Sequence, residues 1–110
     1  MEIYFKNKKT EKVFNDFNKL SQKHGARQAK KTIQRINELN AAESLHDINI
    51  LRAPGLHSLS GKQKGFWAVN LVHPFRLIIE PLDGDTVELK RVTKVKIIEL
   101  IDYHWRRDNE

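Results

Sequence analysis

The order of two hydrophobic periodicities along the chain constrains the fold more than any single motif. Between about Thr10 and Ala42 the apolar residues recur at helical spacing, and Gly25 interrupts this pattern once. The spacing predicts two helices joined by a short break, which is typical of an antiparallel hairpin. From Phe66 onward the chain is rich in Val, Ile, Leu and Thr, as strands are. Helices followed by consecutive strands predict the α+β class rather than alternating α/β units.

Outside the helical part the sequence contains β-type runs at Ile3–Phe5, Phe66–Val72, Phe75–Ile79 and Thr86–Tyr103. The last run is too long for one ordinary strand, so we expect it to break near Thr93 and Lys94. Its latter part is apolar on both faces at several positions, which predicts a central strand. We expect the helical hairpin to cover one face of the sheet and to leave the other face partly open.

Residues 43–64 are the least regular part of the chain, with turn signals at Ala53-Pro54-Gly55 and at Ser60-Gly61. A loop of this length in a compact domain either serves a function or contains a small element that periodicity does not reveal. No repeat, linker or low-complexity stretch divides the chain, so we expect residues 1–110 to form one domain.

The composition limits the classes of protein that remain. The chain has no cysteine, so disulfides and thiolate metal sites are excluded. No window is long and apolar enough to predict a membrane span, so we expect an intracellular, cytoplasmic protein. The net charge is +6, and residues 1–45 carry ten Lys/Arg against five Asp/Glu. Such an excess is typical of a surface that binds a polyanion such as RNA, and equally typical of a solvated helical surface.

The basic residues of the two predicted helices are expected on their outer faces. There they would bind a polyanion such as RNA or form a solvated surface. They are Lys12, Lys19, Lys23, Lys30, Lys31 and Arg35.

The sequence contains no nucleotide-binding, zinc-protease or nucleophile-elbow motif, and its five histidines lack the spacing of metal ligands. We therefore expect no metal and no cofactor. The residues most suited to chemistry are His57, Lys62, Lys64 and Arg76, together with Asp102-Tyr103-His104. Two imidazoles and several cations suit metal-free RNA cleavage. One group would remove the 2′-hydroxyl proton, another would protonate the leaving 5′-oxygen, and a cation would offset charge in the transition state.

Strand alternation through the end of the last run would put Asp102 and His104 on one face and Tyr103 on the other. An aromatic side chain such as Trp67 would stack on an unpaired base. Each of these residues also has an ordinary structural explanation. His57 fits a loop histidine, Arg76 fits a partner for Glu80 or Asp102, and the two lysines fit a solvated entry to a hairpin.

Five segments of the sequence follow one another in a familiar order: Leu56–Gly61, Lys64–Val69, Phe75–Ile79, Asp83–Asp85 and Ile101–His104. Together they resemble the RelE/ParE toxin superfamily, and within it the HigB-type toxins, also called plasmid maintenance system killer proteins. Over residues 1–45 the resemblance rests on the layout of a strand, a helical hairpin and basic helices. It implies an N-terminal strand and a helical hairpin packed on a small, curved, mostly antiparallel sheet.

The resemblance also implies a type II toxin that enters the ribosomal A site and cleaves mRNA without a metal. A cognate antitoxin, with a helix-turn-helix domain, would neutralise it. The catalytic residues would be His57, Arg76, Asp102, Tyr103 and His104, with a lysine role for Lys62 or Lys64. Two alternatives fit the same sequence. One is a ParE-like, non-enzymatic toxin that inhibits DNA gyrase, and the other is a non-toxic, basic RNA-binding module.

Overall fold

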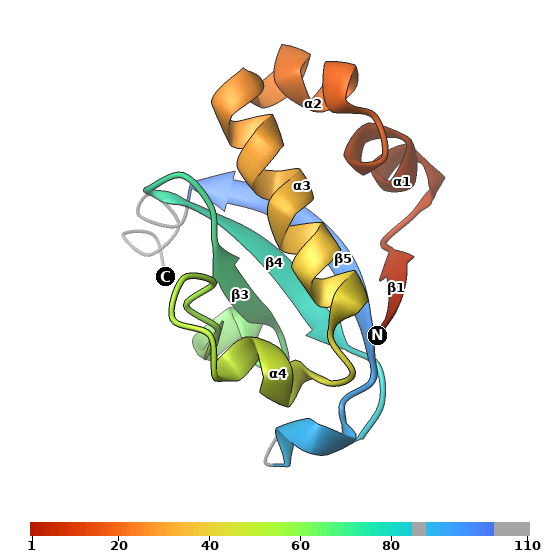
Figure 1. Ribbon diagram of the computed structural model, residues 1–110, viewed down its shortest axis with the longest axis vertical. Coiled ribbons are helices and arrows are strands. Elements are labelled where there is room, and N and C mark those ends of the chain that lie inside the picture. Colours follow the sequence, from red (N-terminus) through yellow and green to blue (C-terminus); the bar gives the residue numbers. More distant parts are fainter. Residues whose placement is uncertain (85–87, 103–110) are drawn as a thin grey trace.

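Figure 1 shows the computed structural model of the chain, which describes residues 1–84 and 88–102. The helices are α1 (Lys8–Phe14), α2 (Phe17–His24), α3 (Ala26–Ala41) and α4 (Leu45–Asn49), with short 3₁₀ helices η1 (Gly61–Gln63) and η2 (Leu89–Arg91). The strands are β1 (Glu2–Phe5), β2 (His57–Ser58), β3 (Trp67–Asn70), β4 (Phe75–Pro81) and β5 (Lys94–Asp102). The helices precede most of the sheet, which confirms the α+β prediction.

The described strands form one sheet in the order β1-β5-β4-β3-β2. β1 runs parallel to β5, and the other neighbouring strands are antiparallel, so the sheet is mostly antiparallel. β5 lies between β1 and β4, which confirms that its apolar pattern marks a strand with neighbours on both sides. The expected break in the last run is also confirmed, because η2 ends at Arg91 and β5 begins at Lys94.

The helix expected before Gly25 is two helices. α1 begins after Asn7, whose side chain accepts a hydrogen bond from the Thr10 amide at 2.8 Å. α2 begins after Asp16, whose carboxylate accepts one from the Lys19 amide at 3.2 Å. Such a cap satisfies an amide that the first helical turn leaves unbonded, so Asp16 favours a helix start over a helix interior.

The irregular segment 43–64 contains α4, β2 and η1, which periodicity did not reveal. β2 is two residues long and is therefore too short to show alternation. It pairs with β3, so that His57 lies opposite Ala68 and Ser58 lies opposite Trp67. This pairing attaches His57 to the sheet.

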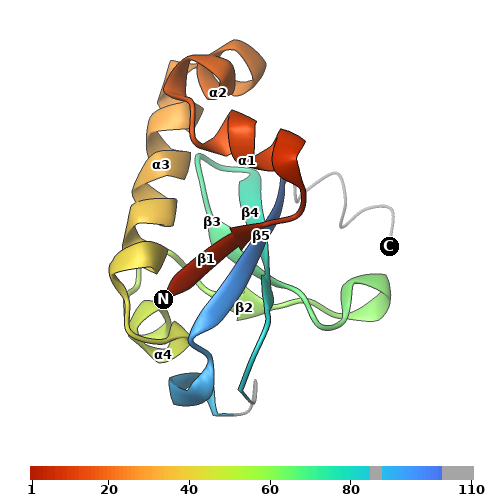
Figure 2. The ribbon, with the colours of Figure 1, turned by 90° about the vertical axis from the view of Figure 1, so that its right-hand side faces the viewer.

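The main core lies between the helices and one face of the sheet. Figure 2 shows α2, α3 and α4 on one side of the sheet and η1 extending from the other side. The core is built from side chains that are at most 1% exposed, among them Leu20, Leu39, Leu45, Leu77, Ile79 and Ile97. A smaller cluster of Leu59, Ala68 and Ile78 lies apart from this core. We call the sheet face that carries Ala68 and Ile78 the open face.

The turn after β4 is held by one carboxylate. Asp83 accepts hydrogen bonds from the Thr93 amide at 2.8 Å, the Thr93 hydroxyl at 2.5 Å and the Lys94 amide at 3.0 Å. The bond from the Thr93 side chain is the main reason that the pKa of Asp83 lies below its ordinary value of 3.8. The charged carboxylate therefore stabilises the connection to β5.

Replacement of Asp83 by asparagine is expected to lower the free energy of unfolding at pH 7 by about 1 kcal/mol, because hydrogen bonds to a charged acceptor become bonds to a neutral one. The folded-state pKa is depressed, so the contribution is complete above 3.8 and is lost as the pH falls through the lower folded value. Urea unfolding of both proteins at pH 7 and pH 3 measures the difference. Glu43→Gln, which removes an exposed carboxylate, is the control. An equal difference at both pH values would contradict this role.

Candidate active site

The strand register places His57 in a row with residues of three neighbouring strands. His57 lies opposite Ala68, Ala68 opposite Ile78, and Ile78 opposite Glu99. Directly opposed residues of antiparallel strands carry their side chains on the same face. His57 and Glu99 therefore both lie on the open face. Neighbouring strands are about 4.8 Å apart, so the row spans about 14 Å.

Arg76 belongs to the next row of the open face. It lies opposite Asn70 on β3 and Ile101 on β5, two residues before Ile78 on its own strand. Because Ala68 and Glu99 are two residues from those partners, both are diagonal neighbours of Arg76. Diagonal neighbours are within reach of long side chains. The structure thus places His57 and Arg76 in adjacent rows of one face and adds Glu99 to them.

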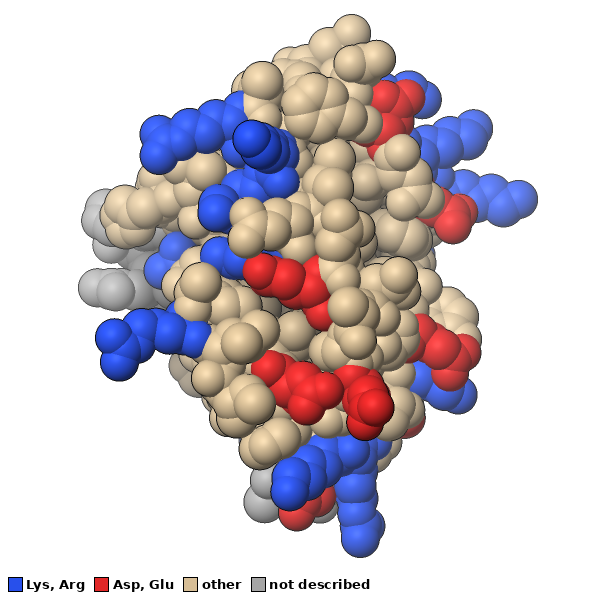
Figure 3. Space-filling model, viewed as in Figure 1, with Lys and Arg blue, Asp and Glu red and all other residues tan. Residues whose placement is uncertain are grey.

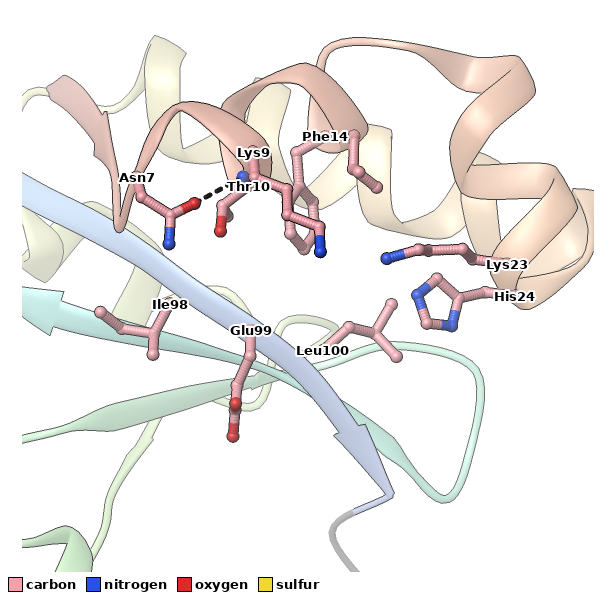
Figure 4. A pocket seen from close by; sticks show the side chains of 10 residues that line it. Asn7, Lys9, Thr10, Phe14, Lys23, His24, Ile98, Glu99 and Leu100 are labelled. Atoms are coloured by element: carbon pink, nitrogen blue, oxygen red, sulfur yellow. Dashed lines mark hydrogen bonds between the residues drawn. The ribbon is translucent and has the colours of Figure 1, made fainter.

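A β-bulge explains why strand alternation does not predict Glu99 on this face. Ile79 pairs with Ile97, whereas Ile78 pairs with Glu99, so one extra residue of β5 is inserted between the two pairs. Simple alternation from Ile97, which is fully buried in the core, would put Glu99 in the core as well. The bulge shifts the alternation by one residue. Figure 4 shows the Glu99 side chain pointing across β5 and away from α1.

The same bulge also determines which face of the sheet carries Asp102. Asp102 lies opposite Phe75, and Leu100 lies opposite Leu77, so Asp102 shares the helix-covered face. It is therefore on the opposite face of the sheet from His57 and Arg76, so the strand register does not place the three predicted residues on one face. The predicted site residues Tyr103 and His104 lie outside the described residues.

Trp67, which the sequence predicts to contact RNA, is not on the sheet face that carries His57. Trp67 lies opposite Ile79 and packs, half-buried, against the main core. Its neighbour Phe66 packs instead against the cluster of the open face. Of the two aromatic residues, Phe66 is therefore the one on the side of His57.

His57 is held by the turn that precedes β2. Its Nδ1 lies 2.9 Å from the carbonyl oxygen of Gly55. A carbonyl oxygen only accepts, so in this contact Nδ1 carries the proton and, in a neutral ring, Nε2 carries the lone pair. The arrangement gives His57 the tautomer in which Nε2 can act as a base.

Lys62 and Lys64 are exposed, in or directly after η1 in the connection from β2 to β3. Figure 2 shows that η1 extends from the sheet on the side away from the helices. The two lysines thus belong to the same side of the molecule as the open face.

The helical cations do not form one patch. Figure 3 shows basic side chains over α1 and, on the opposite flank, over the first half of α3. On α3, Arg27, Lys30 and Lys31 line a cavity of about 430 Å³ together with His73 of the β3–β4 turn. Lys12, Lys19, Lys23 and Lys30 are exposed, and Lys31 is partly exposed.

Arg35 is the exception among the predicted surface cations. It is only 4% exposed, so the expectation that it lies on an outer helix face is wrong. Its guanidinium bonds to protein carbonyls and to Glu38 rather than facing solvent.

A second basic cavity lies between α1, the end of α2 and β5 (Figure 4). It has a volume of about 260 Å³ and is lined by Lys9, Lys23 and His24 with apolar residues such as Phe14 and Leu100. Partial burial, and then the charge of Lys23, lower the pKa of His24 below its ordinary value of 6.5. Glu99 also belongs to the lining of this cavity, whereas His57 and Arg76 do not.

Among residues 1–84 and 88–102, no three His, Asp or Glu side chains come together in a group that could hold a metal ion. Within the same ranges, no helix has the length and apolar character needed to cross a membrane.

The chain matches one family model and is similar in fold to solved toxin structures. Residues 3–91 match the family model described as RelE-like toxin of type II toxin-antitoxin system HigB. No curated protein sequence matches. The fold is similar to a YoeB/ParE toxin from Agrobacterium tumefaciens, with a TM-score of 0.55, 14% identity, and 91% of this chain and 95% of that chain covered. It is also similar to a chain of the YoeB-YefM complex from Staphylococcus aureus, with a TM-score of 0.53, 16% identity, and coverages of 91% and 93%.

Proposed function

This chain belongs to the HigB-like toxins, the RelE-like toxins of type II toxin–antitoxin systems, and from that membership we propose that it is a ribosome-dependent mRNA endonuclease. The observation that carries the proposal is the strand register, which places His57, Arg76 and Glu99 on the open face of the sheet. A base, a cation and a carboxylate on an accessible surface are suited to cleavage of an RNA strand laid across it.

The reaction needs no group beyond protein side chains. A base removes the proton of the 2′-hydroxyl, the 2′-oxygen bonds to phosphorus, and the bond from phosphorus to the 5′-oxygen breaks. An acid protonates that oxygen, which leaves a 2′,3′-cyclic phosphate and a 5′-hydroxyl. We assign the base to Nε2 of His57, because Nδ1 faces the Gly55 carbonyl. Arg76 offsets the charge that develops on the phosphate oxygens.

The remaining assignments complete this proposal. Glu99, a diagonal neighbour of Arg76, orients the guanidinium. Lys62 and Lys64 attract the RNA backbone from the η1 side. The family resemblance implies catalytic roles for Tyr103 and His104, and we assign the acid to one of these two residues. The site of action is the ribosome in the cytoplasm.

Regulated expression in bacterial cells tests the function. The expected result is growth arrest with mRNA cut inside reading frames, and coexpression of a protein encoded beside the toxin gene should relieve it. Growth arrest with DNA-damage signalling and intact mRNA would instead support gyrase inhibition. Absence of any growth effect would favour a non-toxic RNA-binding module.

The exposed lysines of the helices are proposed to dock on ribosomal RNA. Replacement of Lys12, Lys23 and Lys30 together by glutamine is expected to weaken ribosome binding and to lower the slope of log K against log salt by about 2 to 3. The reason is that each lost phosphate contact releases about one counterion fewer. Binding measured across a salt series gives the slope.

A triple variant with the same charge loss is the control for this docking surface. Arg52, Lys90 and Arg91 are also exposed, but they lie outside α1, α2 and α3. Their replacement by glutamine should leave the slope nearly unchanged. Equal slopes for both triple variants would refute a docking role for the helices. Weaker antitoxin binding by the helix variant alone would assign the same surface to the antitoxin.

A further inference from the structure

Arg35 is a charged side chain that the main core nearly encloses. It is 4% exposed, on α3, and its nearest charged partner is Glu38, one helical turn later. Nη1 lies 2.9 Å and 3.1 Å from the two carboxylate oxygens of Glu38. A buried charge needs such a partner, but the ion pair leaves the other two nitrogens of the guanidinium available for further bonds.

Those nitrogens bind two distant parts of the chain. Nε donates to the carbonyl of Asn70 at 2.7 Å, and Nη2 donates to the carbonyl of Ala53 at 3.1 Å. Asn70 ends β3, and Ala53 precedes the turn that leads into β2. One rigid, planar group thus connects α3 to both segments, which a lysine could not do in the same geometry.

The two segments are also joined to each other. The main-chain N–H of Asn70 donates to the Pro54 carbonyl at 2.7 Å. The side chain of Asn70 lies so close to Gly55 that a Cβ at position 55 would come within 2.1 Å of its Nδ2. Arg35, Asn70 and residues 53–55 therefore form one contiguous unit, which we call the Arg35 clamp.

The Arg35 clamp ends at the proposed base. The Gly55 carbonyl, the last group of residues 53–55, is the acceptor for Nδ1 of His57. Asn70 is also directly opposite Arg76 across the β3–β4 ladder. A single buried guanidinium thus supports both residues that the proposed mechanism places on the open face.

We infer that Arg35 is a positioning residue, which holds residues 53–55 so that the Gly55 carbonyl keeps the proton of His57 on Nδ1. The consequence for catalysis rests on the proposed function. The consequence for the His57 tautomer does not, because it follows from the hydrogen bonds alone. Without the guanidinium, the Asn70 and Ala53 carbonyls lose the hydrogen bonds that Arg35 donates, and the turn that carries Gly55 loses this attachment to α3.

The test compares Arg35→Gln with Arg52→Gln. Arg52 is an exposed arginine just before the same turn, so its replacement removes equal charge without touching the clamp. Long-range ¹H–¹⁵N spectra, recorded where the ring is neutral, report which nitrogen of His57 carries the proton. We expect the Nδ1–H form in the wild type and in Arg52→Gln, and a mixture of both tautomers in Arg35→Gln.

Cleavage kinetics give the second readout. Arg35→Gln is expected to lower kcat by about 10- to 100-fold through misplacement of the base, with KM changed less than about twofold. Arg35→Lys should recover only part of kcat, because it keeps the charge but lacks the fork of donors. A folded Arg35→Gln protein that keeps the Nδ1–H tautomer would overturn the inference. If the wild-type protein does not cleave mRNA, the proposed function is wrong, but the inference about the His57 tautomer is unaffected.

If Arg35→Gln does not fold, the clamp can be disturbed from its other end. Gly55→Ala introduces a Cβ against the Asn70 side chain, at a φ of 54° that L side chains rarely adopt, and keeps the Arg35 side chain in place. A shifted tautomer of His57 in this variant supports the clamp, and an unshifted tautomer contradicts it.

Discussion

Replacement of His57 by alanine is expected to lower the rate of mRNA cleavage on the ribosome by about 10²- to 10⁴-fold, the usual contribution of a positioned acid or base. The loss arises because Ala68 and Ile78, which follow His57 in its row, cannot accept a proton. The carboxylate of Glu99 is at the far end of the row, about 14 Å from His57. Single-turnover cleavage of a defined mRNA on programmed ribosomes measures this rate. Growth arrest on expression should be lost in parallel.

Three further variants test whether the loss of activity is specific to His57. His46→Ala removes a histidine of α4 that has no part in the proposed site, and it should retain full activity. Arg76→Ala should reduce the rate by a similar factor to His57→Ala. The double variant should lose less than the product of the two factors, because residues that act together in one transition state are not additive. Cleavage by His57→Ala within threefold of the wild type would refute its role as the base.

Replacement of Leu77 by alanine is expected to lower the free energy of unfolding by about 2–5 kcal/mol, as for other fully buried leucines. Leu77 is 0% exposed and lies between Val69 of β3 and Leu100 of β5. Hydrogen bonds to both neighbouring strands hold the backbone there, so the space left by the side chain cannot close by movement of β4. Since whole domains are stable by about 5–15 kcal/mol, this one change removes a large share.

Urea unfolding followed by circular dichroism measures the effect of Leu77→Ala. The midpoint should fall while the dependence of unfolding free energy on urea stays the same. Leu82→Ala is the control, because Leu82 is 41% exposed and its loss should cost less than about 1 kcal/mol. Equal destabilisation by both changes would contradict the assignment of Leu77 to the main core.

The architecture could be predicted because its signals are local. Helical spacing, strand-like runs and Gly25 each depend on residues within one or two turns of the chain, and the α+β order follows from them. Where the local signal was short, the prediction was incomplete. β2 has only two residues, which is too few for alternation to reveal it. Asp16 caps the start of α2, but helical spacing alone predicts it inside one longer helix.

The face of α3 that packs on the core could not be predicted from local signals. Gln28, Thr32 and Arg35 are buried, although their side chains are polar. Gln28 bonds to both main-chain groups of Val72, and Arg35 bonds to Asn70 and Ala53. These partners are 18 or more residues away along the chain. Local periodicity therefore predicts that the isoleucines of α3 face the core and that Arg35 lies on the outer, solvent-facing side of the helix.

The sequence by itself determined the class of fold and the choice of His57 and Arg76 as residues suited to RNA cleavage. It also indicated the toxin family, because the motifs that carry the resemblance are contiguous. Only the tertiary structure decided which side chains share a face. One extra residue in β5 moved Glu99 to the open face and Asp102 away from it. A bulge depends on pairing between strands, and pairing is a property of the folded sheet that no single strand contains.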